Sequence, residues 1–449
     1  MKKILKNVTS VVAIATVFTA SLYAAEKKGD KPKEVVPPKR VVDLKTKYTR
    51  NCVSLAAKKP PEKRPFKSTP EGVYKRLNKA MELMGAEDYN GSLEIMKGLY
   101  ERNQDRSYVK ALVALNLGKL YINMNQDAQA MRYFQIALDE ASLQIPQEQG
   151  ARLNLASYQY GEGNYDAALK LVKQWFKFET NPKDTGYVLL AGIYMQQGKM
   201  KDSICPSYLA IENSKKYNKN IFSLLLNAHN ELKDKKGTIK VAKAMLEIWQ
   251  DDPSNWRSLS TLYSIDEQFD NALAVMDLMY RQNFFEKKDD YLMLSSFFAM
   301  ADIPKKAADV LKDGIEKGLV KSEEKRWVVV GQNYHAANEL KKAVDAYEKA
   351  SETADHGDHY AKQGQLYAFL EQWNSAVKAY DRALEKGNLK DKGKVIYDKA
   401  FALYYADRFT DAIKALEQAK GYKKQRAKAQ RWISYIESRI RTLEELAAN

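Results

Sequence analysis

The stretch NWRSLSTLYSIDEQFDNALAVMDLM, residues 255–279, decides the fold. It contains a large aromatic residue, a Leu, a small residue and a Tyr at helical spacing, then a turn, then an aromatic residue, an Ala and a bulky residue. Residues three or four apart share one face of a helix, so each half of the stretch predicts an amphipathic helix. The same order of residue types returns from Trp327 to Ala350 and from Tyr360 to Ala383. Three copies of so long a pattern predict an internal repeat.

A small residue near the start of the second helix marks each repeat along the chain. Successive gaps between these residues are 38, 38, 35, 35, 34, 35, 36, 33 and 36 residues. The small side chain lets two helix axes approach closely, and stacking on the next pair buries the apolar face that one pair exposes alone. The pattern therefore predicts ten helix-turn-helix pairs, of which the fifth fits least well because Lys233 and Lys235 occupy its turn and aromatic positions. The ten marker residues are Ser92, Ala130, Ala168, Ser203, Thr238, Ala272, Ala307, Ala343, Ala376 and Ala412.

From about Val73 to Ala419, these phased positions resemble the tetratricopeptide repeat family. The resemblance implies an all-α fold, a right-handed superhelical solenoid of about ten repeats closed by a C-terminal capping helix. It also implies a function in protein–protein interaction, because stacked repeats present extended binding surfaces.

The N-terminus has the features of a signal peptide over residues 1–25. Three lysines precede an apolar run from Val8 to Leu22, and Ala24 and Ala25 offer a small-residue cleavage site. The run of about 15 residues is short for a membrane span, which needs about 20, although an uncleaved anchor is the alternative. No later stretch is apolar enough to cross a bilayer. The mature protein is therefore expected in the periplasm.

Three further segments follow the signal peptide. Residues 26–70 are rich in Pro and Lys and predict a flexible, mostly extended arm, of which residues 41–57 could fold against the first repeat or a partner. Residues 71–422 are expected to form the solenoid. Residues 423–449 predict the capping helix, with one apolar face and one strongly basic face.

The chain is basic, with a formal net charge of +16. Without the three lysines of the signal segment, 70 basic residues remain against 57 acidic ones. An exported protein meets no nucleic acid, so acidic proteins, anionic lipid head groups or the cell wall are the expected contacts of a basic surface, and a merely solvated surface is the alternative. Cys52 and Cys205 can form a disulfide in an oxidising compartment, and the sequence leaves open whether they pair.

The sequence contains no arrangement of residues typical of an enzyme. Its densest group of metal-ligand side chains is His356-Gly357-Asp358-His359, in the connection between the eighth and ninth repeats. A zinc site needs three or four ligands, and only Asp355 is close in sequence to add one. Gly357 and Asp358 fit a turn and a helix start equally well. We therefore expect no metal site, no cofactor and no catalytic residue.

Polar side chains on the first helix of each repeat are the candidates for contact with a partner, because these helices line the concave face of such solenoids. The set does not reproduce the lysine-and-asparagine clamp with which some repeats of this family hold a terminal carboxylate, so C-terminal peptides are not the expected ligand. Projection of the helical spacing selects Asn227, Asn230, Arg257, Thr261, Gln332, His335 and Gln365.

Two stretches resemble a narrower group, the periplasmic repeat proteins associated with TonB systems of Gram-negative bacteria. They are WFKFETNPKDTGYVLLAGIYMQQGKMKDS, from Trp175, and AADVLKDGIEKGLV, residues 307–320. The resemblance implies an accessory role beside TonB, ExbB and ExbD, with one of these components as partner. The alternative is an envelope assembly factor whose basic surface binds cell-wall or polysaccharide components.

Overall fold

The computed structural model describes residues 43–60, 64–65 and 67–448, and the regular secondary structure within them consists of 21 helices and no strand. The expected signal peptide lies outside these residues. The chain divides into two compact units, residues 1–250 and 251–449, which are treated separately below. In the described part of the chain, every helix is too short or too polar to cross a membrane.

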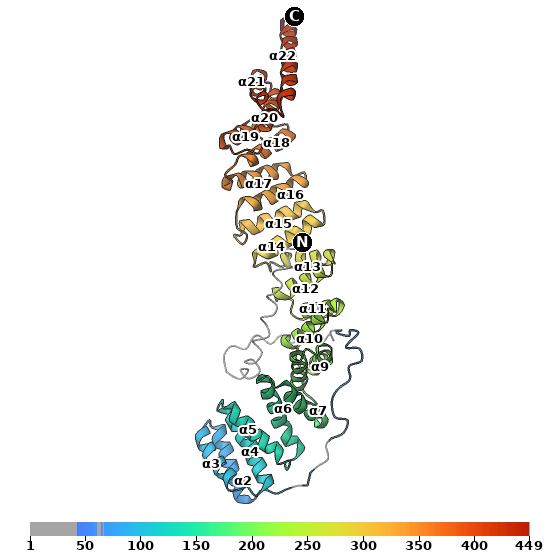
Figure 1. The fold of residues 1–449 in the computed structure, drawn as a ribbon, viewed down its shortest axis with the longest axis vertical. Helices are drawn as coiled ribbons and strands as arrows, with labels where there is room; N and C mark the ends of the chain where they lie inside the picture. The colour runs from blue at the N-terminus through green and yellow to red at the C-terminus, as the bar shows by residue number, and fades with distance from the viewer. Residues whose placement is uncertain (1–42, 61–63, 66, 449) are drawn as a thin grey trace. The chain divides into compact units, whose positions relative to one another are not determined.

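Consecutive helices pack as antiparallel pairs in both units (Figure 1). The first unit contains α2 (Glu71–Gly85), α3 (Tyr89–Glu101), α4 (Ser107–Asn123), α5 (Asp127–Asp139), α6 (Ile145–Gly161), α7 (Tyr165–Phe178), α8 (Asp184–Gln196), α9 (Met200–Asn213), α10 (Lys219–Glu231) and α11 (Lys235–Ile248). The second unit contains α12 (Pro253–Ile265), α13 (Phe269–Arg281), α14 (Lys288–Met300), α15 (Pro304–Glu316), α16 (Glu324–Ala336), α17 (Leu340–Thr353), α18 (Asp358–Phe369), α19 (Trp373–Lys386), α20 (Lys392–Tyr405), α21 (Phe409–Lys420) and α22 (Arg426–Ala448).

The ten pairs are the ten predicted repeats, so the prediction of an all-α repeat solenoid is confirmed. Each marker residue lies in the second helix of its pair and is buried, including Thr238 in the fifth pair. In two repeats a hydroxyl of the first helix donates to a carbonyl of the second: Ser260 Oγ to that of Ala272 at 3.0 Å, and Ser295 Oγ to that of Ala307 at 2.7 Å. A small residue at these positions brings the hydroxyl and the carbonyl within hydrogen-bonding distance.

A segment that precedes the repeats, residues 43–60, lies against the helices α8 to α11, and we call it the strap. It is tied covalently by the disulfide between Cys52 and Cys205 of α9. Leu44 is only 2% exposed within the apolar core of these helices. The hydroxyl of Tyr187 lies 3.1 Å from Ser54 Oγ and accepts a hydrogen bond from the amide of Leu55.

The strap departs from the expected flexible arm and docks on the fourth and fifth repeats instead of the first. Its sequence contains four lysines and one proline, but Leu44 and Tyr48 give it an apolar side that the core of the first unit covers. The strap also explains why residues 206–211 of α9 are all buried, since a helix with a solvated face would expose some of them.

The helix α22 covers the last pair of the second unit. Ala429, Ile433 and Ile436 are buried in a core shared with α18 to α21, and Ile440 packs against it. The helix begins at Arg426, while residues 423–425 form a turn.

Candidate partner-binding face

The seven candidate residues lie on first helices of the repeats, but in two different units. Asn227 and Asn230 are exposed on α10 of the first unit. The other five are on α12, α16 and α18 of the second unit, where Thr261 and Gln332 are exposed. The structure therefore brings together only those of the second unit that lie on neighbouring repeats.

Arg257 already has partners inside the protein. Its guanidinium binds both carboxylate oxygens of Asp290, with Nε to Oδ1 at 2.8 Å and Nη2 to Oδ2 at 2.9 Å, and it lies 3.4 Å from Glu286. The hydrogen bond to Asp290 is the main reason that the pKa of Arg257 is raised. Two parallel hydrogen bonds fix the guanidinium, so this side chain joins α12 to the start of α14.

His335 and Gln365 belong to one surface between α16 and α18. The ring of His335 stacks on Phe369 with centroids 6.3 Å apart, and Lys362 lies 3.5 Å from Gln365 Oε1. Burial, and secondarily the charge of Lys362, lowers the pKa of His335. His335 is therefore a neutral ring at pH 7, suited to packing and to single hydrogen bonds.

A row of apolar side chains passes through this surface. The row was not identified from the sequence. The last residue of the first helix in each repeat of the second unit is apolar, and four of the five are 59%, 60%, 68% and 45% exposed (Ile265, Met300, Phe369 and Tyr405). In the first unit the same position is small or polar. The helix-end row comprises Ile265, Met300, Ala336, Phe369 and Tyr405, and its first-unit counterparts are Gly85, Asn123, Gly161, Gln196 and Glu231.

Acidic residues border the helix-end row. Two positions after the row, the turn of each repeat carries Glu267, Asp302, Asn338, Glu371 or Asp407. The four carboxylates are exposed, and none of them forms an ion pair within the described part of the chain. The repeat register alone could have revealed both the row and its acidic border, because equivalent positions of stacked repeats lie along one edge.

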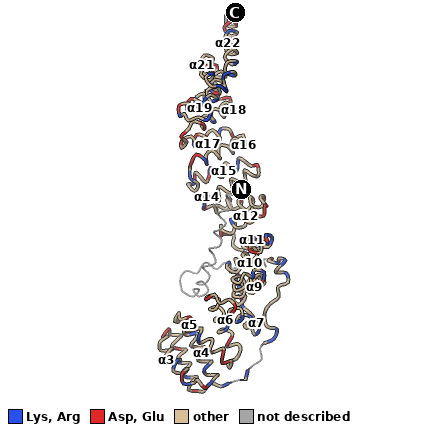
Figure 2. The backbone as a smooth tube through the Cα atoms, viewed as in Figure 1, with Lys and Arg blue, Asp and Glu red and all other residues tan. Residues whose placement is uncertain are grey.

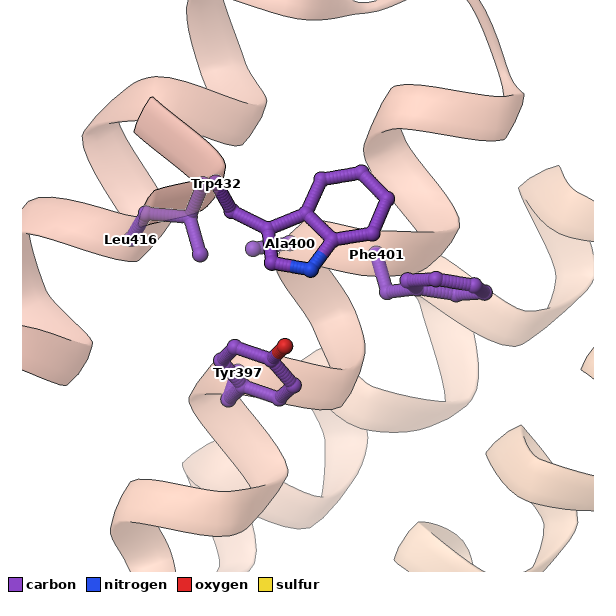
Figure 3. Close-up of a pocket in the computed structure, with 5 residues that line it drawn as sticks. All are labelled: Tyr397, Ala400, Phe401, Leu416 and Trp432. Carbon is purple, nitrogen blue, oxygen red and sulfur yellow. The ribbon is translucent and has the colours of Figure 1, made fainter. Parts of the chain in front are cut away.

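The C-terminal end of the row is supported by an aromatic cluster. Tyr405 stacks on Trp373 with ring centroids 4.6 Å apart, and Phe401 lies edge-on to Trp432 at 5.3 Å. The adjacent depression between α20, α21 and α22 has no room for a water molecule (Figure 3). These side chains therefore form a packed support for Tyr405 and not a pocket for a small molecule.

A third side chain that could bind a metal, Glu324, lies beside His356 and His359 and was not expected from the sequence. Glu324, the first residue of α16, accepts hydrogen bonds on Oε1 from His356 Nε2 at 3.1 Å and His359 Nε2 at 2.8 Å. These bonds, that of His359 first, lower the pKa of Glu324. The assumption that only Asp355 could complete a metal site was wrong, because Glu324 is distant in sequence but adjacent across the repeats.

Residues 115–182 match the family model of the tetratricopeptide repeat. This span runs from α4 to the loop after α7, and the same helix pair recurs throughout both units.

Residues 115–182 of this chain carry tetratricopeptide repeats.

Solved structures of similar chains are distant in sequence. A tetratricopeptide repeat protein from Parabacteroides merdae is 12% identical, with 54% of this chain and 93% of that one covered and a TM-score of 0.34. YrrB, described as a TPR protein with an unusual peptide-binding site, is 18% identical over 45% of this chain and 97% of its own, with a TM-score of 0.30. The C-terminal part of a repeat protein from Cytophaga hutchinsonii is 14% identical over 54% and 98%, with a TM-score of 0.33. No curated protein matches the sequence.

Tetratricopeptide repeats generally act as non-enzymatic scaffolds that bind proteins. The second unit of this chain exposes the helix-end row and its acidic border.

Proposed function

We propose that the protein is a periplasmic protein–protein interaction scaffold and an accessory component of a TonB-dependent energy-transduction and uptake system. The observation that carries the scaffold function is the helix-end row. Exposed apolar side chains recur at one repeat position of the second unit, and exposed apolar side chains that gather on one face mark protein interaction sites. The acidic border favours a partner segment with basic and apolar residues, since complementary charge guides association.

The disulfide supports the proposed compartment. Cys52 and Cys205, the two cysteines of the sequence, are joined to each other. Disulfides persist in the periplasm and other oxidising compartments and are rare in the cytosol. The signal-like residues 1–25 point to the same compartment.

The identity of the partner is proposed from the two stretches that resemble TonB-associated repeat proteins. The first contributes the end of α7, all of α8 and the start of α9, and the second lies in α15 and the loop after it. The proposed partners are accordingly TonB, ExbB, ExbD or a receptor associated with them.

Site-specific photo-crosslinking in cells tests this proposal. A photoreactive phenylalanine analogue is placed at Met300 or Phe369 in the helix-end row and, as matched controls, at Asn123 or Gln196 in the first unit. We expect crosslinks to a TonB-system component from the row and not from the controls. Crosslinks to none of these components would contradict the TonB assignment, and equal yields at all four positions would contradict the assignment of the face.

A substitution at an exposed residue of the helix-end row tests partner binding without disturbing the fold. Phe369→Glu leaves an exposed position exposed, removes its apolar ring and keeps the acidic character of the border beside Glu371. If Phe369 is an anchor of the interface, the affinity for the crosslinked partner falls by about 10-fold or more. Gln196→Glu, at the equivalent position of the fourth repeat, should leave the affinity unchanged.

The basic face of α22 supports a second candidate, an envelope assembly factor that binds anionic cell-wall or polysaccharide components. Acidic and basic residues are interspersed along most helices (Figure 2), but this helix and the turn before it expose six cations besides Lys423. Binding to purified envelope polymers that disappears at high salt would favour this candidate, because salt screens surface charge. The cations are Lys424, Arg426, Lys428, Arg431, Arg439 and Arg441.

A further inference from the structure

The helices α16 and α18, which are the first helices of neighbouring repeats, bring three side chains together that can bind a metal. Glu324 begins α16, His356 lies in the loop that precedes α18, and His359 is the second residue of α18. One donor atom from each lies within 4.8 Å of the other two. The two imidazole rings are tilted against each other with centroids 4.8 Å apart.

The donor set suits a transition-metal ion. Neutral imidazole nitrogens and a carboxylate oxygen are ligands of Zn²⁺, which forms bonds of about 2.0–2.2 Å to both and accepts water as a fourth ligand. Both nitrogens that face Glu324 are Nε2, so one ion can replace the two hydrogen bonds that now converge on Oε1. The side chains of His359, His356 and Glu324 are 13%, 21% and 37% exposed, which leaves one side open to water and ion entry.

Asp358 is placed to orient one of the ligands. Its Oδ2 is buried without a hydrogen-bond partner and lies 3.5 Å from His356 Nδ1. Its Oδ1 is held by the amide of Lys390 at 3.1 Å. In the structure Nδ1 of His356 accepts a hydrogen bond from the amide of Asp358 at 3.3 Å. When Nε2 binds a metal, the ring proton resides on Nδ1, so this hydrogen bond is lost and the proton can be donated to Oδ2. Metal-bound histidines usually donate their second nitrogen to a carboxylate in this way.

His359 is also held in position. Its ring stacks on Tyr347 of α17, with an angle of 24° between the planes and centroids 6.1 Å apart. Tyr347 is buried, so the stacked imidazole has a firm support on one side. Each histidine therefore has its own orienting contact.

We propose that Glu324, His356 and His359 form a binding site for one divalent transition-metal ion of the zinc class. The ion ties the start of α16 to the start of α18 and so joins the eighth and ninth repeats. Asp358 is a positioning residue that acts through His356. This site is separate from the residues of the helix-end row and does not depend on the proposed partner.

Calorimetric titration with zinc sulfate tests the site, using the tag-free mature protein after dialysis against a chelator. We expect one ion per chain. Glu324→Gln, His356→Ala and His359→Ala should each weaken zinc binding at least about 10-fold, and Asp358→Asn by about 10- to 100-fold. Glu323→Gln and His335→Ala change an adjacent carboxylate and a histidine outside the site, and they should bind zinc like the unmodified protein.

Cobalt supplies a measurement that does not depend on the variants. Co²⁺ added to the unmodified protein should produce the visible absorption of a four-coordinate ion and should be displaced by one equivalent of Zn²⁺. Circular dichroism confirms that each variant keeps its helices. Failure of the unmodified protein to bind zinc would overturn the proposal, and so would full binding by the folded His359→Ala variant or loss of binding in His335→Ala.

Discussion

At the scale of single residues, close packing between paired helices depends on glycines, which have no side chain at the point of contact. Gly364 of α18 faces the ring of Tyr380 on α19. A Cβ at this glycine would lie 2.5 Å from Cε1 and 2.7 Å from Cδ1 of that ring. Tyr380 is only 2% exposed and has no room to withdraw. Overpacking of this kind forces backbone shifts or strained rotamers.

We therefore expect Gly364→Ala to destabilise the protein by about 1–3 kcal/mol, even though Ala is the better helix former. Urea unfolding followed by circular dichroism measures the change. Gly98→Ala is the matched control, because a Cβ there meets nothing within 4 Å. The control should be neutral or more stable by up to about 1 kcal/mol. A stabilising Gly364→Ala would contradict the close approach of α18 and α19.

His229 of α10 is fully buried, and its burial disfavours the protonated form of the ring. Its Nδ1 lies 2.9 Å from Asp234 Oδ2, and its Nε2 has no partner. Burial is the largest effect on its pKa and lowers it, while Asp234 opposes the shift. The folded state thus binds fewer protons at this ring than the unfolded chain, whose histidine pKa is about 6.5.

The direction of the pKa shift predicts a pH dependence. As the pH falls below about 6.5, the unfolded chain takes up the proton first, so the contribution of His229 to stability is lost progressively toward the lower folded-state pKa. Unfolding by urea between pH 7.5 and pH 5 should show this loss, and His229→Gln should reduce the slope. An unchanged slope would show that His229 is protonated equally in both states.

At the scale of elements, all ten repeats make the same turn between their two helices. The second residue after the first helix adopts a positive φ in each, from Glu87 at 64° to Asp407 at 57°, and it is Gly in two repeats, at Gly163 and Gly198. This is the left-handed residue that commonly ends helices, and it favours Gly because a Cβ is strained there. Four of the other eight residues are Asn or Asp, which adopt this conformation more readily than other non-glycine residues.

Substitution by glycine at such a turn should therefore stabilise the protein. We expect Glu371→Gly, at a φ of 56°, to stabilise the second unit by up to about 1 kcal/mol, because the relief of strain exceeds the entropy that Gly loses on folding. Thermal unfolding followed by circular dichroism measures this. Lys378→Gly, on the exposed face of α19, should instead cost about 1 kcal/mol. Equal losses in both variants would contradict the argument.

At the scale of the whole molecule, the disulfide connects residues 153 positions apart and holds the strap on α9. A crosslink that closes so long a loop restricts the unfolded chain and contributes about 2–5 kcal/mol to stability. The strap adds packing through Leu44 and an ion pair between Asp43 and Lys240 at 2.9 Å. Both contributions belong to the first unit.

Removal of the disulfide should accordingly loosen one unit only. In the Cys52→Ser/Cys205→Ser variant we expect faster amide hydrogen exchange in peptides of the strap and of α8 to α11, measured by mass spectrometry. Peptides from α12 to α22 serve as the internal control, because the second unit contains no cysteine. Slow exchange in the strap of the variant would show that packing alone holds it.

The sequence by itself determined the repeat: helix pairs, their number and their buried small residues follow from local spacing, because each repeat packs mainly on its neighbours. It also contains the helix-end row, which needs only the repeat register. Two features depended on the tertiary structure. The docking of the strap and the approach of Glu324 to His356 and His359 join residues far apart in the chain, and no local periodicity records such contacts. Their geometry arises only when helices of different repeats are stacked.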